Sequence, residues 1–90
     1  MNDAEKHWHC TNKFVDLANE LQKEDFTEPL ISAAMMAASG IYATYIAAGN
    51  TGGLEPTGVN KVVTAYRNTL EQVQASKKRG REEIAATENN

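Results

Sequence analysis

The segment that decides the fold is "LISAAMMAASGIYATYIAAGN", residues 30–50. It contains no charged side chain, and alanine is its commonest residue. Because alanine is the strongest helix former, the segment predicts a helix that ends near Ala48. A helix that is apolar on every side requires cover on every side.

This alanine-rich helix has two unlike faces when its residues are placed at about 100° per residue. The face of large side chains holds Ile31, Met35, Ala38, Tyr42, Tyr45 and Ile46. The opposite stripe, called here the small-residue face, holds Ala33, Ala37, Gly40, Thr44 and Ala47. A mid-helix glycine costs about 1 kcal/mol relative to alanine, and the close approach of a second helix offsets that cost. The small-residue face is therefore the predicted contact between helices.

Amphipathic patterns on both sides of this segment predict two further helices. Over residues 3–24, Asn2 and Glu5 fit a capping box, and apolar residues recur at steps of three and four. Thr27 and Pro29 suit the start of the central helix, and Gly49 or Asn50 suits its left-handed C-terminal cap. A third helix is predicted to begin near Pro56 or Thr57. The fold class is all-α, with three antiparallel helices and an alanine-rich central one.

Length and composition indicate one domain of residues 1–78, followed by a polar tail over 79–90 that we expect to be disordered. The third helix is expected to end near Lys78 to Gly80. Trp8 is expected to plug one end of the helical bundle, with an anchor at a protein interface as the alternative. The predicted core consists of Phe14, Leu17, Leu21, Met35, Tyr42, Ile46, Val62, Tyr66, Leu70 and Val73.

A chain of 90 residues has little surface with which to cover the central helix on all sides. Monomers rarely expose large apolar patches, and two-fold dimers are the commonest assemblies. We therefore expect a homodimeric helical bundle in which the small-residue face is the contact. A membrane span is the competing interpretation, because 19 uncharged residues run from Leu30 to Ala48. We expect no span, since polar and small residues dilute this run and its tyrosines lie inside it rather than at its rims.

A single cysteine, Cys10, and an N-terminus without an apolar run predict an intracellular, cytoplasmic protein. The segment "HWHC", residues 7–10, raises the possibility of a zinc site. Asp3, His7 and Cys10 share one helical face, and His9 lies beside them. Because paired cysteines or histidines at zinc-finger spacing are absent, we expect no metal and no cofactor.

The basic cluster of Lys77, Lys78, Arg79 and Arg81 is the candidate contact to nucleic acid. Cations near a helix C-terminus also complement the helix dipole, and no aromatic residue lies among them to stack on bases. Nucleic-acid binding and metal binding are therefore alternatives to the main hypothesis, a structural or protein-interaction role. The segment "GNTGG" follows a helix rather than a strand, the wrong context for a phosphate loop, and we expect no enzyme.

Three segments carry a resemblance to a family: "FVDLANE" from Phe14, "ISAAMMAASGIYATYIAA" from Ile31 and "VVTAYRNTLEQ" from Val62. In this order they resemble a small bacterial helical family, the domain of unknown function 3144. The resemblance covers residues from about 10 to 78 and implies a helical fold without a known activity. Ile41 and Ala43 stand where the family pattern has arginine and asparagine, so a polar site built on those two residues is not expected here.

Overall fold

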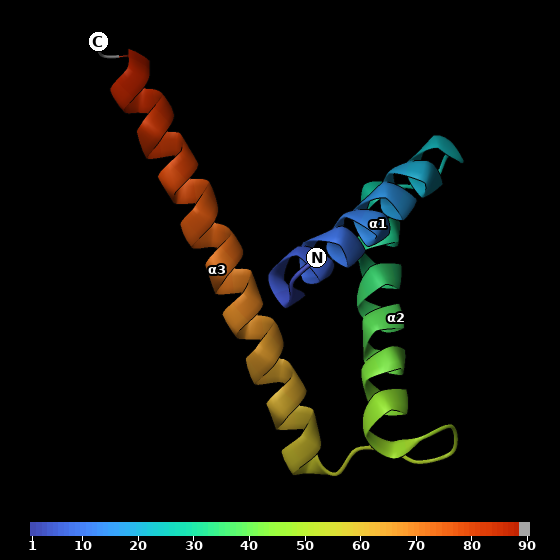
Figure 1. Cartoon of the computed structure of the whole chain (residues 1–90). Helices are drawn as coiled ribbons and strands as arrows, with labels where there is room; N and C mark the ends of the chain where they lie inside the picture. Colours follow the sequence, from blue (N-terminus) through green and yellow to red (C-terminus); the bar gives the residue numbers. More distant parts are fainter. Residues whose placement is uncertain (89–90) are drawn as a thin grey trace. The chain divides into compact units, whose positions relative to one another are not determined.

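The computed structural model describes residues 1–88 and contains three helices, α1, α2 and α3 (Figure 1). Helix α1 spans Asp3–Lys23, α2 spans Glu28–Ala48, and α3 spans Pro56–Glu88. No strand occurs in residues 1–88. The predicted all-α class with three helices is therefore confirmed.

Helix α1 begins with a capping box, as its sequence predicts. The Asn2 side chain accepts a hydrogen bond from the Glu5 backbone N–H at 2.8 Å, and the Asn2 backbone N–H donates to Glu5 Oε1 at 3.4 Å. These two bonds satisfy N–H groups that the first turn of a helix otherwise leaves unpaired.

The turn between α1 and α2 depends on a strained residue and a polar bond. Asp25 has a φ of 72°, in the left-handed region that residues other than glycine rarely adopt. Its N–H reaches back to the carbonyl oxygen of Gln22 at 3.3 Å, which closes the end of α1. Gln22 Nε2 also donates to Glu28 Oε1 at 2.7 Å, so a side-chain hydrogen bond joins the two helices across the turn.

Both ends of α2 are formed by the residues that the sequence indicates. Thr27 lies immediately before the helix, and its hydroxyl oxygen accepts from the Leu30 backbone N–H at 3.4 Å. Pro29 lies in the first turn, where its missing N–H breaks no helical hydrogen bond. Gly49 follows the last helical residue with a φ of 78°, which identifies it as the left-handed cap.

Helix α3 begins at Pro56, as predicted, but it does not end near Lys78. It continues through Glu88, so residues 79–88 are helical rather than disordered, and residues 89–90 lie outside the described part of the chain. The physical reason is local, because residues 75–88 are mostly alanine, lysine, arginine and glutamate, which are strong helix formers. The cost of the single Gly80 is too small to end a helix between such neighbours.

The chain divides into two compact units, Met1–Ile46 and Ala47–Asn90. The first holds α1 and nearly all of α2, and the second holds α3 with the loop before it. The boundary between the two units, after Ile46, lies inside the single domain of residues 1–78 that the sequence predicts.

The predicted hydrophobic core is absent from both units, because no residue in 1–87 is buried. Phe14 is 66% exposed, Tyr42 66% and Tyr66 53%, whereas Leu21 is half-buried. A pair of helices covers only the strip along which they touch, and a single helix cannot enclose its own side chains. The remaining predicted core residues are also exposed: Leu17, Met35, Ile46, Val62, Leu70 and Val73.

Candidate functional site

The small-residue face of α2 is the candidate functional site, and four of its five members are exposed. Ala33, Ala37, Gly40 and Ala47 are open to solvent, while Thr44 is half-buried. A Cβ built on Gly40 would meet no atom within 4 Å outside the neighbouring helical backbone. Within the first unit, the space above the middle of α2 is therefore free for the approach of another helix.

Thr44 contributes a methyl group to this face without leaving a hydroxyl that needs a partner. Its Oγ1 donates to the Gly40 carbonyl oxygen at 2.8 Å, one helical turn earlier. A buried hydroxyl without a hydrogen bond costs about 1–3 kcal/mol, and this internal bond avoids that cost when the face is covered. The small-residue face therefore behaves as an apolar surface along its length.

Large apolar side chains border the small-residue face, and the sequence interpretation did not include them. At about 100° per residue, Leu30 and Ile41 lie along one edge of the face and Met36 along the other. They are 56%, 72% and 54% exposed, respectively. The helical wheel that defines the two faces of α2 also locates these three residues. The sequence interpretation omits them because they lie between the small-residue face and the face of large side chains.

The opposite face of α2 carries large side chains that are also open to solvent. Met35 is 43% exposed, and the rings of Tyr42 and Tyr45 have centroids 6.2 Å apart in a tilted arrangement. Thus most side chains on both faces of α2 remain exposed within its own unit, although Ile31 and Thr44 are half-buried.

Length and composition alone make α2 a helix that is able to cross a membrane, and it is the one such helix within residues 1–88. None of its apolar window is buried. Core helices of soluble proteins can have the same length and composition. This observation therefore shows that α2 is apolar, but it does not distinguish a helix in a bilayer from a helix that packs against protein.

The residues considered for a metal site all lie on α1 and are not brought together. Among the described residues, no group of three or more histidine, cysteine, aspartate or glutamate side chains is close enough to hold a metal ion. Cys10 is a free, exposed thiol, and Asp3, His7 and His9 are exposed as well. Trp8 does not act as a plug within its own unit, because it is 61% exposed. The rings of Trp8 and His7 form a T-shaped pair with centroids 6.1 Å apart.

The basic cluster lies at the start of the last third of the observed α3, about two turns before its end. Lys77, Lys78, Arg79 and Arg81 are all exposed. Because the helix continues to Glu88, these cations do not cap its C-terminus, and that explanation of the cluster is wrong.

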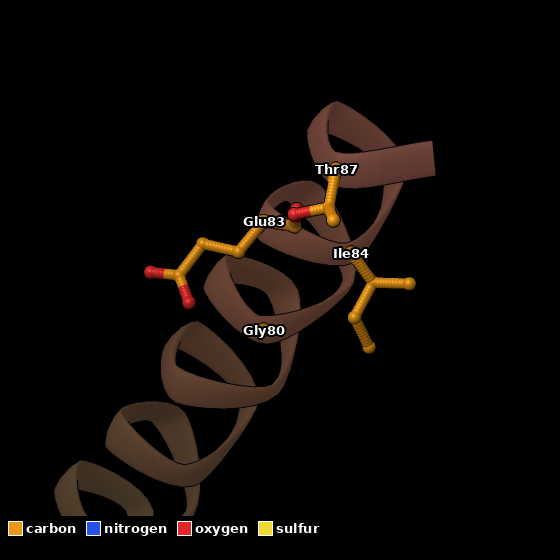
Figure 2. A pocket seen from close by; sticks show the side chains of 4 residues that line it. All are labelled: Gly80, Glu83, Ile84 and Thr87. Carbon is orange, nitrogen blue, oxygen red and sulfur yellow. The ribbon is translucent and has the colours of Figure 1, made fainter. Parts of the chain in front are cut away.

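One open hollow lies just beyond this cluster, lined by Gly80, Glu83, Ile84 and Thr87 (Figure 2). The four residues share one face of α3, and Gly80 contributes no side chain to the hollow. Figure 2 shows the Glu83 and Ile84 side chains pointing in different directions, and Thr87 Oγ1 donates to the Glu83 carbonyl oxygen at 2.9 Å. No set of polar groups converges here, so the hollow is not a ligand site.

No protein-family model, curated protein or solved structure matches the chain. The resemblance to the domain of unknown function 3144 therefore stays a prediction. The candidate site depends on the geometry of α2 alone.

Proposed function

We propose that the chain is a protein-interaction module that acts as a homodimer, with the small-residue face of α2 packed on the same face of a second copy. The observation that carries this proposal is that neither unit buries any of its own residues within 1–87, although large apolar side chains line all three helices. Exposed apolar surface of this kind drives association in water.

The small-residue face is the proposed contact because two helices approach most closely where their side chains are smallest. Packed helices lie about 8–10 Å apart, and the distance depends on the side chains at the contact. In a two-fold dimer the same patch meets itself, so Gly40 of each copy would lie near the centre. The internal hydrogen bond of Thr44 allows this centre to lose water without an unpaired hydroxyl.

The bordering side chains would supply the free energy of association. Leu30, Met36 and Ile41 are half to three-quarters exposed, so covering each one would contribute about 1–2 kcal/mol. Six such side chains in two copies give about 6–12 kcal/mol. Association costs about 4–15 kcal/mol. Burial of these six side chains would therefore do no more than offset the cost of association.

A stable dimer therefore requires more cover than α2 alone provides. Phe14 and Leu17 of α1 are 66% and 57% exposed, and both belong to the same unit as α2. We propose that the α1–α2 pairs of the two copies together form a four-helix arrangement that also covers these two side chains. The exposed thiol of Cys10 suits a reducing intracellular compartment for this assembly.

Site-directed crosslinking tests the proposed contact directly. In a Cys10→Ser background, Ala37→Cys places a thiol on the small-residue face, and Ala38→Cys is the matched control on the opposite face. Disulfides form readily only when the two Cα atoms lie about 4.4–6.8 Å apart. We expect mild oxidation to crosslink the Ala37→Cys protein much faster than the control. Equal rates, or faster crosslinking of Ala38→Cys, would reject this contact.

A bilayer-spanning α2 is the second candidate, favoured by the length and composition of this helix. Flotation of the full chain with vesicles of neutral phosphatidylcholine separates the two proposals. A dimeric interaction module stays in the aqueous fraction and remains dispersed without detergent. Flotation with the vesicles, together with precipitation in detergent-free buffer, would support the span and contradict the aqueous dimer.

A further inference from the structure

We draw no further inference here: the strongest candidate, the apolar face of α3 lined by Val59, Val63, Tyr66, Leu70, Val73 and Ile84, repeats at heptad spacing, but nothing in the structure shows what covers it.

Discussion

Two mid-helix glycines, Gly40 in α2 and Gly80 in α3, allow a matched test of the proposed contact. A Cβ at either position meets no atom within 4 Å in the single chain. By local structure alone, alanine should therefore be favourable at both. Only Gly40 lies on the small-residue face, so the two substitutions should differ if that face binds a second copy.

The expected magnitudes follow from helix propensity and packing. Gly80→Ala should stabilise the chain by about 1 kcal/mol and leave the dimer dissociation constant unchanged. Gly40→Ala gains the same helix propensity but inserts two methyl groups into the contact, one from each copy. Overpacking costs about 1–3 kcal/mol per site, hence about 2–6 kcal/mol for the two copies, so the dissociation constant should rise about 30-fold to 20,000-fold.

Sedimentation equilibrium over a wide range of concentrations measures the dissociation constant of each variant. Far-ultraviolet circular dichroism reports whether the helices persist, and urea denaturation at low concentration reports the stability of the single chain. Gly40→Leu extends the series, because a leucine side chain is too large for a close helix contact to accommodate by small shifts. We expect Gly40→Leu to keep most of its helical signal while losing the dimer.

The reasoning fails if Gly40→Ala and Gly80→Ala behave alike. Equal stabilisation with the same dissociation constant would mean that no helix approaches Gly40 in the assembly. A wild-type chain that stays monomeric at high concentration, with cooperative unfolding, would equally refute the proposed dimer.

Five further substitutions test the turns and caps by thermal or urea denaturation. Asp25→Gly should stabilise the chain by about 0.5–1 kcal/mol by relieving the left-handed backbone, a prediction that a lowered midpoint contradicts. Gly49→Ala should destabilise the chain by about 1 kcal/mol, because alanine is strained at the positive φ of this position. An unchanged unfolding midpoint would mean that the loop rearranges freely. Gly52→Ala should destabilise the chain because its Cβ would overlap the Ala48 carbonyl oxygen. Gly53→Ala is the matched control, because its Cβ meets open space and should have little effect on stability. Similar effects of the two substitutions would show that the clash at residue 52 does not occur in solution. Asn2→Ala should cost about 1 kcal/mol and speed hydrogen exchange at the Glu5 amide, and unchanged exchange would exclude a role for the capping box.

The parts of the fold that the sequence predicts correctly depend on residues close together in the chain. Each helix end that was predicted correctly depends on hydrogen bonds or backbone angles within a few residues. These ends are formed by Asn2 and Glu5 at the start of α1, Thr27 and Gly49 at the two ends of α2, and Pro56 at the start of α3. Such local interactions are readable from sequence because no distant partner affects them.

The end of α3 was missed because one glycine was given more weight than the propensity of its neighbours. Gly80 costs about 1 kcal/mol, a cost that flanking lysine, arginine, glutamate and alanine residues outweigh. The left-handed Asp25 was also missed, although aspartate tolerates that conformation better than most residues and directly follows the end of α1 and its C-cap residue.

The hydrophobic core predicted for the three helices does not form within either unit, and the reason lies in what an apolar stripe can report. Apolar stripes at helical spacing contain Phe14 and Leu17 on α1 and Met35 on α2. Such a stripe shows that a helix face needs cover but contains no information about the covering element. The prediction assigned that cover to the chain itself, yet these three side chains remain exposed in the first unit. The same pattern would arise if a second copy supplied the cover, because helix packing depends on shape and apolar area rather than on chain connectivity. Only a measurement sensitive to concentration distinguishes the two, since cover within one chain does not weaken on dilution and cover by a second copy does.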